Sequence, residues 1–139
     1  MERFYGADCD PHAMHALNLA FVGDCVFDLF VRERLVCLTE GSVNTLHQRA
    51  VEQVCCRAQA KAVQVLLPLF TEEEKAIYLR GRNAHAAHLP KNANPADYHA
   101  ATALEAVFGY LYLKGEIDRL RDFFSQILAA CGEDSVQPR

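Results

Sequence analysis

The spacing of the apolar residues constrains the fold of this chain more than any other feature of its sequence. They recur at intervals of three and four along almost the whole chain, and no segment alternates with a period of two for long enough to form a convincing strand. Spacings of three and four place residues on one face of a helix. The pattern therefore predicts an all-α fold with five or more helices.

Turn and capping residues divide this pattern into predicted helices. The expected ranges are about 13–37, 42–67, 71–81, 96–113 and 116–131. Pro68 ends the second helix, and Thr71 with Glu74 has the spacing of a capping box at the start of the third. Residues 83–95 then form one long loop between the third and fourth main helices. Loops of that length in compact domains are usually functional or disordered.

The length of 139 residues suits one domain, which we expect over residues 1–132, with a frayed tail at 133–139. The chain has neither a basic segment leading into an apolar one at its start nor a run of about 18 apolar residues. We therefore expect a cytoplasmic protein that does not enter a membrane. The six cysteines form no CxxC pair, so neither a disulfide framework nor a structural zinc site is expected.

Two carboxylates stand on helix faces that are otherwise apolar. The stripe of the first helix carries Leu17, Ala20, Phe21, Phe27 and Val31, and that of the fourth carries Ala101, Leu104, Phe108 and Tyr112. Asp24 falls on the first stripe and Glu105 on the second. An ionised carboxylate on a core-facing stripe is costly unless it is paired or binds a metal. Pairing with an Arg, or a half-solvated place at the edge of the stripe, is the alternative interpretation.

Two glycines favour the metal interpretation. Gly23 precedes Asp24, and Gly109 lies one turn after Glu105. A glycine within a helix usually marks the close approach of another backbone. Such an approach would bring the two carboxylates together, where they repel unless a cation lies between them. With oxygen ligands alone, the expected ion is Mg²⁺, with Mn²⁺ as a substitute. Asp28 is either an outer-sphere partner or a solvated or ion-paired residue.

The distribution of charge points to a polyanionic partner, although the net charge of −4 argues against one. Residues 1–40 and 97–139 are net acidic, whereas residues 41–96 carry a net charge of +3. Arg49, Gln53, Arg57 and Lys61 follow at four-residue spacing, which predicts a straight polar and basic stripe on the second helix. A merely solvated face is the alternative. A divalent metal beside a basic, loop-rich surface indicates hydrolysis of a phosphodiester.

Three stretches of the sequence resemble the ribonuclease III family. The first is LAFVGDCVFDLFVRERL, which is similar to the signature helix whose aspartate binds catalytic metal. The second is ATALEAVFGYLYL, which is similar to the helix whose glutamate binds the same metals. The third is TEEEKAIYLRGRNAHAAHLPKNA, which resembles the loop region of Mini-ribonuclease III, the branch without a double-stranded-RNA-binding domain. Leu17, Ala20 and Thr102 stand where full-length ribonuclease III carries further carboxylates, so metal binding should rest mainly on Asp24 and Glu105.

The resemblance implies a Mg²⁺-dependent endoribonuclease with a ribonuclease III-type domain. It implies a homodimer formed through the signature helices, cleavage of double-stranded RNA to leave 5′-phosphate and 3′-hydroxyl ends, and maturation of large-subunit (23S) ribosomal RNA. Whether a ribosomal protein presents the substrate, and whether one or two metals bind, stays open. The residues expected to contact RNA are Arg49, Arg57, Lys61, Arg80, Arg82, Asn83, Lys91 and Asn92.

Two other functions remain as alternatives at this point. One is a weakly active or inactive RNA-binding or ribosome-assembly protein on the same fold, because three of the family's carboxylate positions are apolar or hydroxyl residues. The other is a helical protein-interaction domain in which Asp24 and Glu105 are simply ion-paired. Cleavage of an RNA duplex separates the enzyme from both.

Overall fold

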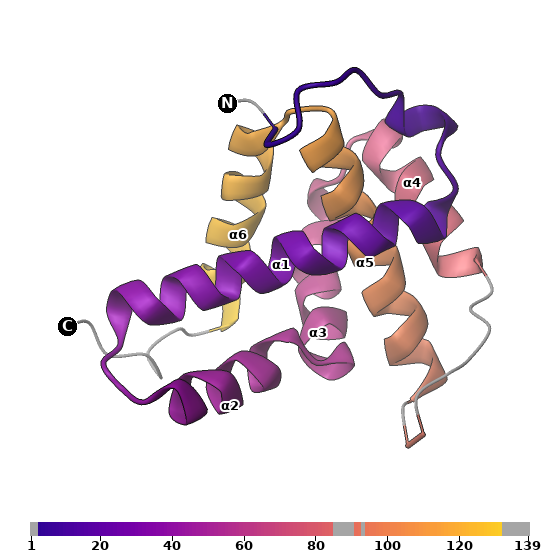
Figure 1. The fold of residues 1–139 in the computed structure, drawn as a ribbon. Coiled ribbons are helices and arrows are strands. Elements are labelled where there is room, and N and C mark those ends of the chain that lie inside the picture. The colour runs from indigo at the N-terminus through magenta and orange to yellow at the C-terminus, as the bar shows by residue number, and fades with distance from the viewer. Residues whose placement is uncertain (1–2, 85–90, 93, 132–139) are drawn as a thin grey trace.

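The structure, a computed structural model, describes residues 3–84, 91, 92 and 94–131, and for Cys56, Arg57 and Cys131 it describes the backbone only. Across these ranges the chain forms six α-helices, two short 3-10 turns and no strand, so the all-α prediction is confirmed. The helices are α1 (Ala16–Leu38), α2 (Val43–Val54), α3 (Cys56–Leu66), α4 (Glu72–Asn83), α5 (Pro95–Leu113) and α6 (Ile117–Cys131) (Figure 1). The turns are η1 (Pro11–Ala13) and η2 (Leu67–Leu69).

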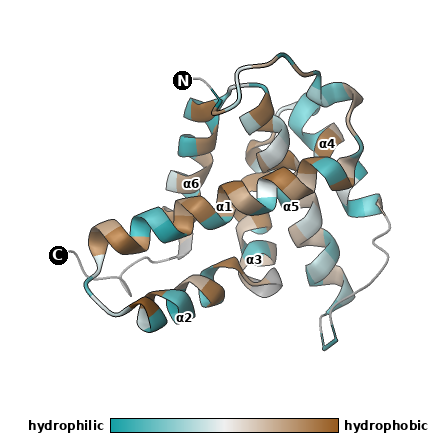
Figure 2. Cartoon of the chain, in the orientation of Figure 1, coloured by the Kyte–Doolittle hydropathy of each residue, from teal (hydrophilic) through white to brown (hydrophobic). Residues whose placement is uncertain are grey.

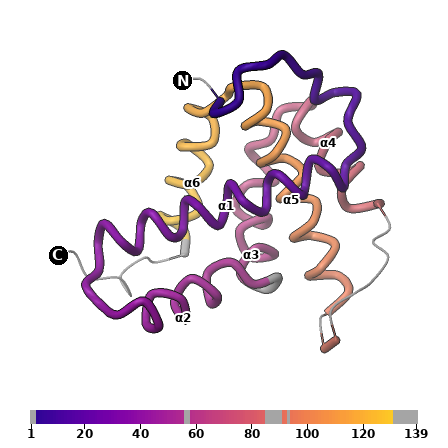
Figure 3. Tube along the Cα trace, in the orientation of Figure 1, coloured from indigo at the N-terminus to yellow at the C-terminus, as the bar shows by residue number. Residues whose placement is uncertain are grey.

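Helix α5 is the centre of the fold. It packs against α1, α3, α4 and α6, and α1 makes the most extensive contact as it crosses α5 (Figure 3). Every residue from 101 to 111 is buried except Glu105, as expected for a helix surrounded by others. No helix in the described ranges is long and apolar enough to span a bilayer.

The core lies where α1, α5 and α6 meet. Phe27 of α1 stacks on Phe108 of α5 with ring centroids 5.4 Å apart, and Phe124 of α6 packs edge-on against Phe108. The apolar residues of α1 are not confined to this inner face, because Phe21 is 79% exposed (Figure 2). The expectation that Phe21 belongs to the inner stripe is therefore wrong, whereas Ala20, Phe27 and Val31 are buried there.

The single helix expected over residues 42–67 is in fact two helices. The backbone is extended at Cys55 (φ −67°, ψ 160°), and α2 and α3 leave this residue in different directions (Figure 1). Helix α2 packs against α1, whereas α3 packs against α5 and α6. One straight helix could not cover both surfaces. The predicted straight stripe from Arg49 to Lys61 is consequently divided between two helices, which corrects that expectation.

The remaining helix ends follow the sequence closely. The predicted capping box is present, because the Thr71 side chain accepts from the Glu74 backbone N–H and the Glu74 side chain accepts from that of Thr71. Helix α5 ends at Leu113, and the turn after it contains Gly115, whose positive φ of 78° is favourable for a glycine. Most of the predicted loop over residues 83–95 and the predicted tail at 133–139 lie outside the described residues.

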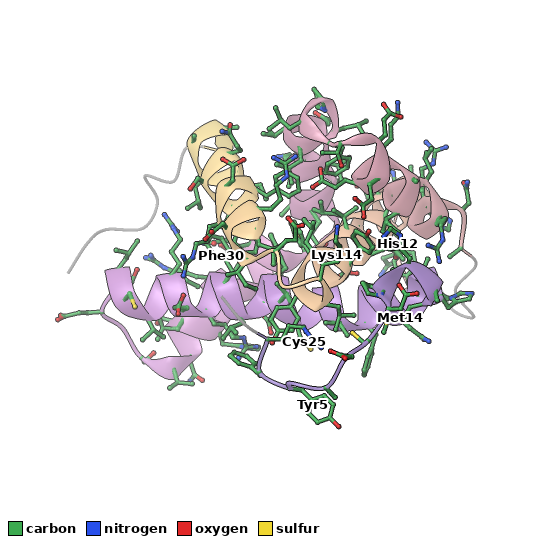
Figure 4. The ribbon with its side chains drawn as sticks, turned by 90° about the horizontal axis from the view of Figure 1, so that it is seen from above. Tyr5, His12, Met14, Cys25, Phe30 and Lys114 are labelled. Carbon is green, nitrogen blue, oxygen red and sulfur yellow. The ribbon has the colours of Figure 1, made fainter. Side chains whose placement is uncertain are left out.

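The segment before α1 is tied to α4 and α5 by polar contacts. The hydroxyl of the buried Tyr110 lies 2.8 Å from Nε2 of His12 and donates to the Glu73 carboxylate. Arg80 of α4 donates to the backbone carbonyls of His12 and Met14, which lead into α1 (Figure 4). These contacts fix the start of α1 against the neighbouring helices.

Candidate metal-binding active site

Helices α1 and α5 cross at the two glycines, with their backbones in contact. A Cβ atom built on Gly23 would lie 1.7 Å from the carbonyl oxygen of Glu105, and one built on Gly109 would lie 1.9 Å from that of Leu19. Neither distance leaves room for a side chain. The close approach predicted from these glycines is confirmed, and its reason is that backbone atoms of each helix occupy the space a side chain would need.

The crossing brings the two predicted ligands together. Asp24 follows Gly23 on α1, and its carboxyl group is hydrogen-bonded to that of Glu105 on α5. Glu105 is half-buried, whereas Asp24 is exposed. The expectation that Asp24 occupies a core-facing position is thus wrong. Gly23 lies at the contact between the two helices, so the next residue, Asp24, lies at the edge of the crossing.

The environment of Glu105 opposes its ionisation. Burial raises the pKa of the Glu105 carboxyl to about 8, and the charge and hydrogen bond of Asp24 add to the effect, while a hydrogen bond from Gln59 acts the other way. None of these groups is a cation. Among the described residues, pairing with an Arg is therefore not what sets the pKa of Glu105.

The residues present suit a hydrated divalent ion. The two carboxylates supply only oxygen donors, which favours Mg²⁺ or Mn²⁺. The described residues contain no group of three or more His, Cys, Asp or Glu side chains arranged for a metal. Mg²⁺ is commonly bound by one or two carboxylates and keeps several waters, so a pair of acids is sufficient for it.

Three positions around the pair provide no further carboxylate. Ala20 is buried and Leu17 is half-buried on α1. Thr102, one turn before Glu105, is buried, and its hydroxyl donates to the Tyr98 carbonyl at 3.0 Å within its own helix. Asp28 forms an ion pair with Arg32 at 3.0 Å, which is one of the two roles expected for it. Asp24 and Glu105 therefore remain the candidate ligands.

Sequence reasoning missed Gln59, which joins the pair from α3. Its side chain is buried, and its Nε2 donates to Oε2 of Glu105 at 3.3 Å and to the Val54 carbonyl at 2.8 Å. A signal was available, because Gln59 precedes Ala62, Val63 and Leu66 by three, four and seven residues and so shares the buried stripe of α3. A polar residue on such a stripe requires a partner.

The predicted RNA-contacting residues are distributed over α2, α3, α4 and the turn before α5. Arg49 is half-buried on α2, and the exposed residues are Lys61 on α3, Arg80, Arg82 and Asn83 on α4, and Lys91 with Asn92 in the turn. The structure does not describe the side chain of Arg57. Arg80 is engaged with the carbonyls before α1, whereas Arg82 and Asn83 end α4 on the side of the molecule where α5 begins (Figure 1).

Comparisons with known proteins agree with this geometry. The Ribonuclease III domain family matches residues 17–116, which include both candidate ligands. The chain is 42% identical to Mini-ribonuclease 3 of Symbiobacterium thermophilum over 89% of this chain and 92% of that protein. It is 36% identical to Mini-ribonuclease 3 of Enterococcus faecalis over 89% and 96% of the two chains.

A crystal structure from Fusobacterium nucleatum has the same fold. It superposes with a TM-score of 0.80 at 24% sequence identity, over 87% of this chain and 99% of that one. The matched family, the curated relatives and the paired acids at the glycine crossing lead to one conclusion. The chain belongs to the ribonuclease III family and, within it, to the Mini-ribonuclease III group.

Proposed function

We propose that this protein is a Mg²⁺-dependent endoribonuclease that cleaves double-stranded RNA and leaves 5′-phosphate and 3′-hydroxyl ends. The observation that carries the proposal is the pairing of Asp24 with Glu105 where α1 and α5 cross at Gly23 and Gly109. Burial and the neighbouring Asp24 both oppose ionisation of Glu105, so a bound ion would relieve an energetically costly arrangement.

Asp24 and Glu105 would hold the ion. When bound, a divalent metal lowers the pKa of a coordinated water and stabilises charge that develops on the scissile phosphate. Glu105 is anchored in the central helix and is half-buried, so its carboxyl group has a defined position. Asp24 is exposed beside it, which leaves the pair accessible to a substrate phosphate.

Basic residues away from the pair would bind the RNA backbone. Lys61, Arg82 and Lys91 are exposed and suited to phosphate contacts, and Asn83 and Asn92 would shape the loop near them. Such contacts position a duplex without reading its sequence. In A-form RNA the major groove is deep and narrow, so we expect recognition of duplex shape and 2′-hydroxyl groups.

We also propose that the protein acts as a homodimer joined through α1. The outward face of α1 is apolar, with Phe21 79% and Leu29 54% exposed. Together with Phe30 and residues of α6 such as Phe124, it borders a hollow of about 480 Å³ (Figure 4, where Phe30 is labelled). An apolar surface of this kind is typical of a protein–protein contact. Its position on a signature helix supports a second copy of this chain as the partner.

The proposed substrate is precursor large-subunit (23S) ribosomal RNA, and a cytoplasmic location follows from that substrate. The support is membership of the Mini-ribonuclease III group. Depletion of the protein from its host should leave unprocessed ends on this RNA, which primer extension would detect. Processing in vitro of naked precursor RNA, compared with precursor bound to ribosomal proteins, would test whether such a protein presents the substrate.

The decisive test of the activity is incubation of an end-labelled RNA duplex with the protein in Mg²⁺ and in EDTA. We expect discrete products with Mg²⁺ and none with EDTA. Asp24→Asn should abolish cleavage while duplex binding stays within about twofold, because the change removes a ligand charge and no phosphate contact. Undiminished cleavage by D24N, or an absence of Mg²⁺-dependent products from the unmodified protein, would contradict the proposal. Salt-sensitive duplex binding without cleavage would instead favour the RNA-binding alternative.

A further inference from the structure

Gln59 is a buried amide with an unusual set of contacts. It lies in the first turn of α3, is 3% exposed, and uses its Nε2 for two hydrogen bonds, one to Val54 and one to Glu105. Its Oε1 is buried and accepts no hydrogen bond from any residue that the structure describes. An unpaired buried acceptor destabilises the folded state. A side chain with this cost is poorly explained by stability of the fold alone.

The break between α2 and α3 determines which end of the amide faces Glu105. In an uninterrupted helix the Val54 carbonyl would accept from the backbone N–H four residues later. The extended conformation of Cys55 removes that partner, and the amide nitrogen of Gln59 takes its place at 2.8 Å. A reversed amide would set its oxygen against the carbonyl oxygen, which is repulsive. The N–H end is therefore held toward both acceptors.

This orientation makes Gln59 a fixed donor to one oxygen of Glu105. The distance from Nε2 to Oε2 of Glu105 is 3.3 Å. The contact limits rotation of the carboxyl group about its terminal bond. Asp24 of α1 also acts on this carboxyl group, so residues of two other helices influence it.

We propose that Gln59 is a positioning residue, which holds the Glu105 carboxylate in the orientation that binds a divalent cation together with Asp24. The proposal rests on the proposed function and adds a residue outside the two signature helices to its site. Residues that orient a metal ligand in this way typically contribute a factor of about 10–100 to metal affinity or activity.

The test compares Gln59→Met with Gln64→Met on the same helix. Methionine has similar length but cannot donate, and Gln64 is exposed. Mn²⁺ affinity of the RNA-free protein is measured by electron paramagnetic resonance. We expect Q59M to bind Mn²⁺ about 10-fold more weakly or worse, and Q64M to match the unmodified protein. On an RNA duplex, Q59M should lose kcat at fixed Mg²⁺, partly recovered at higher Mg²⁺, with duplex affinity unchanged.

A purely structural role would produce a different result. Q59M would then melt at a lower temperature, while Mn²⁺ affinity per folded molecule stayed the same, and that outcome would overturn the proposal. Should Q59M fail to fold, the side-chain amide resonances of Gln59 and Gln64 in the unmodified protein provide a second measurement. Addition of Mg²⁺ should shift those of Gln59 and leave those of Gln64 in place, and an unmoved Gln59 would equally overturn the proposal.

These measurements separate this proposal from the proposed function. Metal affinity and amide shifts are measured without RNA, so they give a result even if the unmodified protein cleaves no duplex. Conversely, Mg²⁺-dependent cleavage by the unmodified protein, combined with unchanged Mn²⁺ affinity of folded Q59M, would leave the nuclease assignment intact and exclude the role of Gln59.

Discussion

A carboxyl group is seldom placed both among buried residues and beside a second acid, but Glu105 is in such a position. It lies in the middle of the central helix, among residues that are otherwise all buried, and it faces a second acid from α1. Burial and the neighbouring Asp24 raise its pKa to about 8. The folded, metal-free protein therefore retains a proton on this group at a pH where the unfolded chain has released it.

This difference predicts how stability depends on pH. The unfolded chain ionises Glu105 near pH 4.5 and the folded protein near pH 8, so between these values the folded state binds more protons. The free energy of unfolding in EDTA should accordingly fall as the pH rises from about 5 to 8. Glu105→Gln should remove the contribution of Glu105 to this decrease in the free energy of unfolding. Urea denaturation at several pH values measures it.

The control for this experiment is Glu52→Gln, which changes an exposed carboxyl group on α2. It should keep the pH dependence of the unmodified protein. Parallel curves for E105Q and the unmodified protein would show that Glu105 does not titrate differently in the folded state.

At the residue scale, the sequence was sufficient to single out the two acids that the structure brings together, but not their surroundings. Glu105 was identifiable because an acid on an apolar helical stripe is unusual, and Asp24 because the adjacent Gly23 indicated the contact. The exposure of Asp24 was missed because the apolar spacing placed Asp24 itself on the inner stripe, whereas Gly23 occupies the crossing point. Gln59 was missed because its partners, Val54 and Glu105, come together only through the interruption between helices α2 and α3 at Cys55.

At the scale of helices, the site depends on how α1 crosses α5. The two backbones touch at Gly23 and Gly109, so the contact has no side chain that could adapt to a change. The contact between α1 and α5 is also the most extensive between any two helices of the described fold. The stability of the fold and the relative position of Asp24 and Glu105 are consequently linked at this point.

Gly23→Ala should therefore disrupt both. The added Cβ would lie 1.7 Å from the Glu105 carbonyl oxygen, so the helices must separate. We expect a loss of about 3 kcal/mol or more in the free energy of unfolding, together with loss of Mn²⁺ binding. Gly6→Ala is the matched control, because a Cβ there meets nothing within 4 Å. A melting temperature for G23A within about 2 °C of that of the unmodified protein would contradict the close contact.

Most helices were predictable from the sequence, and the exception has a physical reason. The capping box at Thr71 and the glycine at 115 mark ends that local residues determine. The break at Cys55 has no proline or glycine beside it. It arises because α2 covers α1 while α3 covers α5 and α6, and this tertiary requirement leaves no local signal in the sequence.

For the whole molecule, the uneven distribution of charge and apolar surface is the feature with functional consequences. Residues 41–96 carry a net positive charge, and the apolar face of α1 lies on another segment. A dimer joined through α1 would leave the basic surfaces of both copies free for one RNA duplex. Affinity for RNA should nevertheless fall steeply with salt, since phosphate contacts release counterions.

Phe21→Glu tests the dimer. Phe21 is 79% exposed on the apolar face of α1, so a charge there should not impair the fold but should oppose burial against a second copy. Sedimentation analysis should give a monomer for F21E and a dimer for the unmodified protein. Val43→Glu is the control, because Val43 is 80% exposed on α2 and does not line the hollow at α1, and it should remain dimeric. Identical sedimentation of F21E and the unmodified protein would exclude α1 as the interface.

The backbone contact at Gly23 and Gly109 has a consequence for how this protein can evolve. The separation of the two acids is set by main-chain atoms, whose dimensions no point substitution alters. Core residues farther away, such as Phe123 in α6, can change the packing without resetting that separation. Selection for heat resistance can thus proceed through the distant core, while the spacing of the acids is inherited unchanged as long as both glycines persist.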